Sequence, residues 1–187
     1  MPQSRFQASV IHAASVGAYD MAVHAGADFI THLPIDGPLT PGSLAAMKAA
    51  GQIAVPTTTM MSGILAGRAP LDGLLGNLRA VVDSGIEVLA GTDSNASPGV
   101  PAQIRHGSSL HEEFGFMAQV GMRPIDILRS ATILPAQAFG LTDRGAIVVG
   151  KRADLVLIDG GPLAEIAATT AIRAVWCGGA AQSRIKL

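Results

Sequence analysis

Hydrophobic and polar positions along the first hundred residues repeat one layout. A helical stretch rich in alanine, leucine and valine ends at a glycine, and a short apolar run of strand-favouring residues follows it. Glycine directly after a helix readily adopts the left-handed conformation of a helix cap. A first strand over residues 9–12 precedes the first helix. The helix–strand pairs that this pattern predicts are 21–26 with 28–32, 44–51 with 53–57, and 78–85 with 87–93.

Helices that alternate with short apolar strands are typical of a parallel sheet with right-handed crossovers. In such folds the reacting residues gather at the carboxyl ends of the strands. The predicted ends carry His12, His32, Thr57–Thr59 and Asp93, so three of the four ends have a side chain that can bind a metal. Each of these residues alone has a bland alternative, as a helix cap or a hydrogen-bonded loop residue. Their joint placement favours a shared site.

The segment after Asp93 continues with loops and helices. Residues 94–101 have the composition of a loop, and helices are expected over 110–119, 123–130 and 134–139. Ser108 or Ser109 is the expected cap of the first of these helices, with Glu112 or Glu113 near its third position.

The character of the chain changes from Gly145 onward and becomes β-rich. Residues 146–149 and 153–159 predict a hairpin of two strands, and residues 172–177 and 182–186 predict two more strands. Four strands form one small sheet, which needs a partner layer. Cys177, beside Trp176, is expected to be a buried core thiol.

Composition narrows the functional classes. Of the 187 residues, 49% are hydrophobic and 14% are charged, and the net charge is −1, which argues against disorder and against an electrostatic nucleic-acid surface. The single cysteine excludes an internal disulfide and a cysteine-rich zinc module. Residues 1–6 have no apolar signal core, and no apolar run reaches the roughly 20 residues of a membrane helix. We therefore expect a cytoplasmic protein with no membrane and no nucleic-acid partner.

Several stretches together resemble the amidohydrolase superfamily, in the group related to imidazolonepropionase and metal-dependent prolidases. The most specific is the run G-x-I-x-x-G-K-R-A-D-L-V over residues 145–156. The resemblance covers nearly the whole chain, from about residue 9 to residue 179, and matches only the C-terminal half of such an enzyme. The other matching stretches are V-I-H-A at 10–13, I-T-H at 30–32, L-A-G-T-D at 89–93, G-S-S-L-H-E-E at 107–113 and A-T-I-L-P-A at 131–136.

The resemblance implies an α/β fold: the C-terminal half, about four βα units, of a metal-dependent-hydrolase (β/α)8 barrel. A short β-rich segment of the composite β-sandwich follows. Residues 1–142 would form the partial barrel and residues 143–187 the sandwich strands.

The resemblance also implies the chemistry. His12 corresponds to the metal ligand of the fifth barrel strand, His32 to that of the sixth, and Asp93 to the aspartate of the eighth. Asp93 would contact the metal and accept the proton of a metal-activated water. That water attacks the carbonyl of an amide or lactam C–N bond in a non-peptide or dipeptide substrate. The expected cofactor is a divalent metal, zinc first, with manganese, iron or nickel as alternatives, in one or two ions.

Parts of the family's site have no counterpart in the sequence. The H-x-H pair of the first barrel strand is missing, and neither Lys48, in a helix, nor Lys151, in the predicted hairpin, can be the bridging lysine of the fourth strand. We expect the chain to need a second half-barrel or a second copy of itself. The alternative is a truncated, catalytically inactive fragment or an interaction module.

Three further residues are candidate contacts for the small-molecule substrate. His106 follows the loop after Asp93, Asn95 either contacts substrate or turns that loop, and Thr58 either lines the pocket or is an ordinary β-branched strand end. His24, on the first helix, is expected to be a surface or packing histidine.

Overall fold

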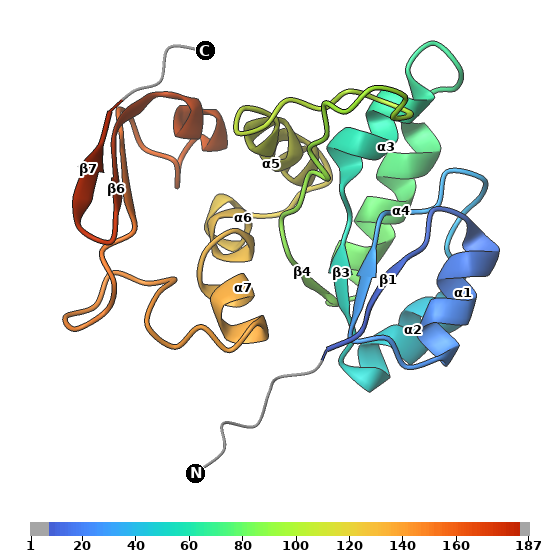
Figure 1. Cartoon of the computed structure of the whole chain (residues 1–187). Coiled ribbons are helices and arrows are strands. Elements are labelled where there is room, and N and C mark those ends of the chain that lie inside the picture. The colour runs from blue at the N-terminus through green and yellow to red at the C-terminus, as the bar shows by residue number, and fades with distance from the viewer. Residues whose placement is uncertain (1–7, 184–187) are drawn as a thin grey trace. The chain divides into compact units, whose positions relative to one another are not determined.

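A computed structural model of the chain describes residues 8–183. It divides into two compact units, Met1–Met122 and Arg123–Leu187. Each unit is described by itself, and Figure 1 labels their helices and strands.

The first unit is built on a four-stranded parallel sheet in the order β1-β2-β3-β4. Its register pairs Ile11 with Ile30 and Ile30 with Ala54, so the strands are aligned and their carboxyl ends lie at one edge. Helices connect successive strands, as the alternating pattern predicts. The strands are β1 (Val10–His12), β2 (Phe29–Thr31), β3 (Ile53–Val55) and β4 (Glu87–Val88).

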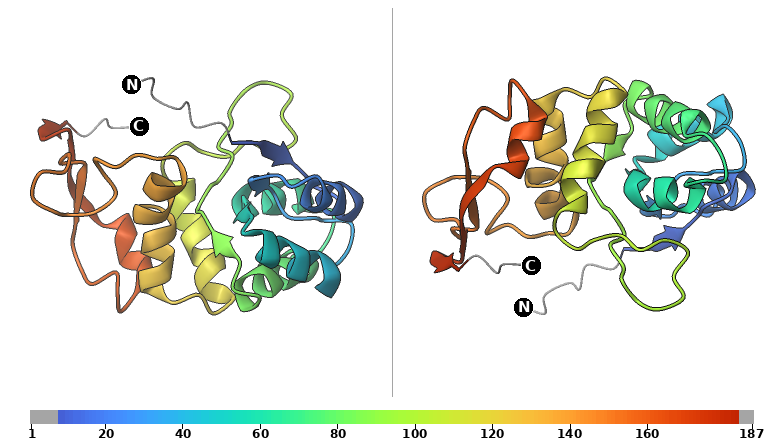
Figure 2. Two further views of the ribbon diagram at one scale, coloured as in Figure 1. Left: turned by 90° about the horizontal axis from the view of Figure 1, so that it is seen from below. Right: turned by 90° about the horizontal axis from the view of Figure 1, so that it is seen from above.

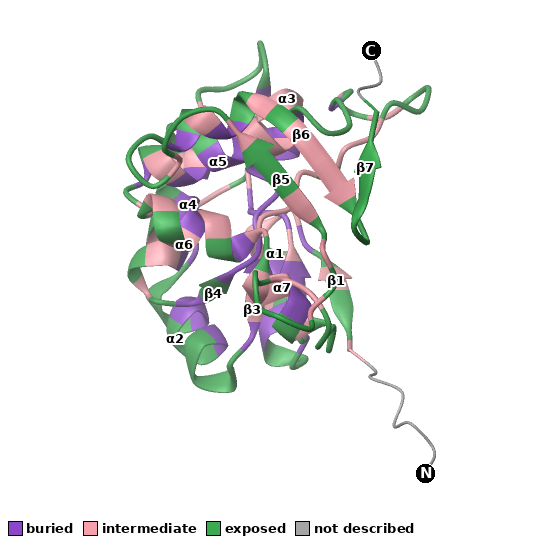
Figure 3. Cartoon of the chain, turned by 90° about the vertical axis from the view of Figure 1, so that its left-hand side faces the viewer, coloured by how far each residue is buried: buried purple, intermediate pink, exposed green. Residues whose placement is uncertain are grey.

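Five helices complete the first unit. α1 packs beside α2, and α3 packs beside both α4 and α5, as the views in Figures 1 and 2 agree. Figure 3 colours their buried residues purple, and the largest of these fill the core between helices and sheet. The helices are α1 (Val16–His24), α2 (Pro41–Ala50), α3 (Thr58–Leu65), α4 (Asp72–Asp83) and α5 (Ser109–Gln119).

Local sequence explains where the first helices begin and end. The Ser15 hydroxyl accepts a hydrogen bond from the N–H of Ala18 and caps α1. The Thr40 hydroxyl caps α2, which then begins with Pro41 at a position where a missing N–H costs nothing. Gly51 ends α2 in the left-handed conformation, as predicted.

One helix of this unit was missed by the sequence pattern. Residues 57–59 were expected to end the third strand, but β3 stops at Val55 and Thr58 begins α3. Threonines are strand-favouring residues, so local propensity misled the prediction. The methionines Met60 and Met61 are buried in this helix.

The second unit combines two helices with a three-stranded antiparallel sheet in the order β5-β6-β7. The predicted strand over 146–149 is wrong, because these residues form no strand and Ile147 and Val149 are exposed. β5 pairs instead with β6, which forms a hairpin with β7. The predicted strand over 182–186 lies partly outside the described residues. The elements are α6 (Pro124–Ser130), α7 (Ile133–Ala138), β5 (Leu155–Ile158), a 3₁₀ helix (Ile166–Thr170), β6 (Ile172–Cys177) and β7 (Ala180–Gln182).

The G-K-R-A-D run has a structural role in this sheet. Asp154 accepts a hydrogen bond from the N–H of Gly178 at 2.7 Å and pairs with Arg152 at 2.9 Å. Gly178 lies in the β6–β7 turn, so the run fastens that turn to the start of β5. Cys177 is exposed, contrary to the prediction of a buried thiol, because it is the last residue of β6 and adjoins the exposed β6–β7 turn.

Among residues 8–183, no helix is long and apolar enough to cross a membrane.

Candidate functional site

The carboxyl ends of β1 and β2 bring two histidines together. His12 is the last residue of β1 and is exposed, whereas His32 directly follows β2 and is 5% exposed. Their ring centroids lie 4.3 Å apart, with the planes at 69° in an edge-to-face arrangement. The imidazoles therefore share one small region at the edge of the parallel sheet, as the strand pattern predicts.

Three residues after strand ends adopt a backbone conformation that is rare outside glycine. Within residues 8–183, the non-glycine residues with positive φ are His32 at 73°, Thr57 at 47° and Asp93 at 51°. They follow β2, β3 and β4 respectively. Each such residue costs on the order of 1–3 kcal/mol and persists only where its surroundings hold it, so such residues concentrate at functional sites. The strain thus singles out the same edge of the sheet as the two imidazoles.

His32 is held by a neighbouring threonine. Its Nδ1 lies 2.6 Å from the Thr57 hydroxyl, and both side chains are buried. Burial lowers the pKa of His32, the charge of His12 lowers it further, and the Asp93 carboxylate opposes them. A neutral imidazole is the form that can bind a metal.

Asp93 is exposed and lies beyond the end of β4. It follows the last strand of the parallel sheet, at the same edge as the two histidines, and its charge opposes the lowering of the His32 pKa. In the described part of the chain, however, no three His, Cys, Asp or Glu side chains are grouped closely enough to hold a metal ion. The chain therefore brings the two imidazoles together and leaves the carboxylate outside a three-ligand cluster.

A buried glutamate holds the start of α3, the helix that begins at this edge of the sheet. Glu113 of α5 is fully buried, and its carboxylate accepts hydrogen bonds from the N–H groups of Thr58 and Thr59 at 3.0 and 2.7 Å and from the Thr59 hydroxyl at 2.8 Å. Burial raises the pKa of Glu113, and these hydrogen bonds oppose that rise. The sequence pattern predicts only a local capping role for Glu113, in its own helix, whereas the structure gives it a tertiary one. Its spacing from Ser109 and Met117, the neighbouring turns of the buried face, was the signal that it lies inside.

The comparison with protein families agrees with this arrangement. The model of the amidohydrolase family matches residues 8–181. The chain belongs to the amidohydrolase family. It is 29% identical over 181 residues to the imidazolonepropionase of Deinococcus radiodurans, an alignment that covers 94% of this chain and 41% of that protein. A 59-residue segment, 32% of the chain, is 54% identical to the adenine deaminase of Sinorhizobium fredii and covers 10% of it.

Solved structures with the same fold superpose on the chain. A Xaa-Pro dipeptidase with methionine bound in its active site matches with a TM-score of 0.79 at 23% identity, over 94% of this chain and 44% of that one. Phenylurea hydrolase B matches with a TM-score of 0.73 at 26% identity, over 94% and 43%. The chain therefore spans less than half the length of these relatives.

The three candidate substrate contacts of this amidohydrolase chain lie in differing environments. Thr58 is fully buried at the start of α3. Asn95 forms a two-bond bridge with Ile104, and its side-chain oxygen accepts from the N–H of Ser97, so its amide turns its own loop. His106 is exposed in the same loop. Their roles toward substrate stay predictions. His24 is exposed on α1, and its Nδ1 lies 2.7 Å from the carbonyl of Asp20, in accord with a surface residue.

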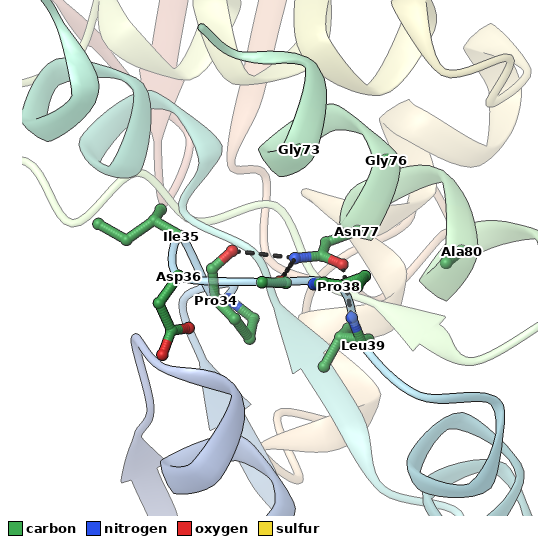
Figure 4. A pocket seen from close by; sticks show the side chains of 10 residues that line it. Pro34, Ile35, Asp36, Pro38, Leu39, Gly73, Gly76, Asn77 and Ala80 are labelled. Carbon is green, nitrogen blue, oxygen red and sulfur yellow. Dashed lines mark hydrogen bonds between the residues drawn. The ribbon is translucent and has the colours of Figure 1, made fainter. Parts of the chain in front are cut away.

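A hollow of about 490 Å³ lies between the loop after His32 and helix α4. Figure 4 shows the side chains that line it. Asn77 of α4 lines this hollow and is 2% exposed. Its amide donates to the carbonyls of Pro34 and Gly37 and accepts from the N–H of Leu39. The polar side chain of Asn77 is thus committed to shaping the loop.

Proposed function

We propose that this chain forms part of a metal-dependent hydrolase that cleaves an amide or lactam C–N bond in a small molecule. The observation that carries the proposal is the His12–His32 pair, two imidazoles 4.3 Å apart at neighbouring parallel strand ends in a member of the amidohydrolase family. Relatives named for imidazolone, adenine, phenylurea and Xaa-Pro substrates favour a C–N bond, in a non-peptide or a dipeptide.

The donor set of this edge fits a divalent ion in part. His12 and His32 would supply two imidazole ligands, which suit zinc and also manganese, iron or nickel. A divalent ion held by these residues would supply a water of lowered pKa and a polarised carbonyl. Asp93 would be the proton carrier, because it follows β4 at the same edge of the parallel sheet and its carboxylate can accept a proton from the attacking water and return it to the leaving nitrogen.

The sheet supports the idea that this is half of a barrel. Among the described strands, β1 pairs only with β2 and β4 only with β3, and Val10 on the outer strand is 57% exposed. Open strand edges invite further pairing. We propose that additional strands, from the rest of a longer chain or from a second copy, complete the barrel and add further ligands to an ion that His12 and His32 already hold.

A second candidate is an inactive interaction module. It is favoured by the lack of any three-ligand cluster within residues 8–183. Such a module would retain the family fold without binding a metal.

Metal stoichiometry separates the two candidates. The chain, purified without a tag, is dialysed against zinc and analysed for bound metal beside His32→Gln and the matched control His24→Gln, whose histidine is exposed on α1. We expect zinc bound by the wild type and by the control, and its loss in His32→Gln. Zinc at background level in the wild type would favour the inactive module, and equal zinc in all three proteins would place the ion elsewhere.

A further inference from the structure

Helix α3 begins in an unusual way. Its N-cap residue, Thr57, has φ 47° and ψ 43° and makes no side-chain cap hydrogen bond to its own helix. The exposed N–H groups of a first helical turn need acceptors, and a carboxylate there is favourable. Glu113, from a segment more than fifty residues away, provides that acceptor to Thr58 and Thr59. The cap is therefore tertiary and fully buried.

The absence of a local cap leaves the Thr57 hydroxyl available for another partner. That partner is His32 Nδ1 at 2.6 Å. For a β-branched residue, the left-handed conformation is a genuine outlier. Both Thr57 and His32 adopt it, so their hydrogen bond joins two strained positions. Strained backbone of this kind needs surroundings that over-determine it.

We propose that Glu113 and Thr57 are positioning residues for His32, in that Glu113 fixes the first turn of α3 and the Thr57 hydroxyl accepts the Nδ1 proton of His32. The inference rests on the proposed function, since the purpose of the arrangement is to present the bare Nε2 of His32 to the site. Both side chains are buried, so they act through His32.

The direction of the hydrogen bond follows from what the other ring nitrogen must do. In a neutral imidazole one nitrogen carries the proton and the other has the lone pair. Ligand histidines donate their second N–H to a fixed acceptor, which sets the tautomer and the ring orientation. A threonine hydroxyl whose backbone is locked can serve as that acceptor. A hydroxyl that donated instead would leave the proton on Nε2 and block it as a ligand.

The test is the tautomer of His32 in the metal-free chain, measured by ¹⁵N–¹H correlation of imidazole nitrogens at a pH where the ring is neutral. The His32 signals are identified by their loss in His32→Gln. We expect one form in the wild type, with the proton on Nδ1. Thr57→Val removes the hydroxyl at nearly constant shape and should move the population toward the Nε2–H form, whereas Thr57→Ser should restore Nδ1–H. Thr31→Val, which removes the hydroxyl of the residue before His32, should leave the tautomer unchanged.

Glu113→Gln tests the indirect half of the proposal. The carboxylate accepts the N–H of Thr58 on one oxygen and the N–H of Thr59 on the other, and an amide has only one oxygen that can accept. We therefore expect the Nδ1–H fraction of His32 in Glu113→Gln to lie between those of the wild type and of Thr57→Val. If Glu113→Gln does not fold, Thr59→Val removes one of the three bonds to the carboxylate and should give a smaller shift in the same direction. A tautomer that stays on Nδ1 in both variants would overturn the role of Glu113.

The proposal and the proposed function fail separately. A wild-type His32 protonated on Nε2, or a tautomer indifferent to Thr57→Val, would overturn the positioning role even if zinc binds. A chain with the expected tautomers that takes up no zinc would retain the positioning role and contradict the metal-dependent function.

Discussion

The loop that follows His32 should depend on a single side chain, Asn77. Its replacement by alanine leaves the N–H of Leu39 and the carbonyls of Pro34 and Gly37 without their partner. A buried polar group left unsatisfied costs about 1–3 kcal/mol. Water from the adjoining hollow can reach the half-buried Gly37 carbonyl, so two of the three groups carry most of the cost. We expect Asn77→Ala to reduce the free energy of unfolding by about 2–4 kcal/mol.

The isosteric variant Asn77→Asp separates hydrogen bonding from volume. It replaces the donating amide with oxygen facing two carbonyls, so it should cost at least as much as Asn77→Ala despite its unchanged size. Urea unfolding can follow the first unit through its only tyrosine, Tyr19, and the second unit through the only tryptophan, Trp176. Asp83→Ala, at an exposed position of the same helix, is the control and should change stability by less than about 0.5 kcal/mol. A similarly small effect of Asn77→Asp would refute the reasoning.

Three other perturbations have defined outcomes. Burial raises the pKa of Tyr19, so its stabilising contribution is complete below an unfolded pKa of about 10 and is lost as pH rises through the folded value. The urea concentration at the unfolding midpoint of the first unit should therefore decrease as the pH rises above about 10. A Tyr19 phenol that ionises near pH 10 while the unit stays folded, detected by tyrosinate absorbance, would contradict this. Gly91→Ala places a methyl 2.6 Å from Val55 Cγ1 and should cost about 1–3 kcal/mol by urea unfolding; a neutral effect would mean that β3 and β4 separate easily. Asp154→Ala removes the acceptor of the Gly178 N–H and should cost about 1 kcal/mol by Trp fluorescence, while Asp154→Asn keeps an acceptor and should cost less; the reverse order would refute that role.

Sequence periodicity predicted the parallel core of the first unit well. Each of β1 to β4 lies within a predicted strand, because buried parallel strands are short apolar runs bounded by glycines that end the preceding helices. It failed where tertiary contacts decide the structure. The threonines after β3 begin a helix because Glu113, distant in sequence, accepts their N–H groups. Residues 147–149 form no strand because β5 pairs with β6 instead. Neither partner is visible in a local window.

The sequence indicates which strand-end residues lie near one another at the candidate site, but it does not indicate their backbone conformations. Strand-end position brought His12 and His32 together as expected. The pattern offered no indication of the positive φ of His32, since that conformation depends on the surrounding loops. The roles of Thr57 and Glu113 could not be predicted for a related reason. The sequence pattern places Thr57 at the end of a strand and gives Glu113 a role only in its own helix.

The most direct test of the central claim is X-ray absorption spectroscopy of the zinc-loaded chain. We expect two imidazole ligands, with zinc–nitrogen distances of about 2.0–2.1 Å, and no bound zinc in His12→Gln or in His32→Gln. A zinc environment without imidazole, or one that contains sulfur from the exposed Cys177, would contradict it.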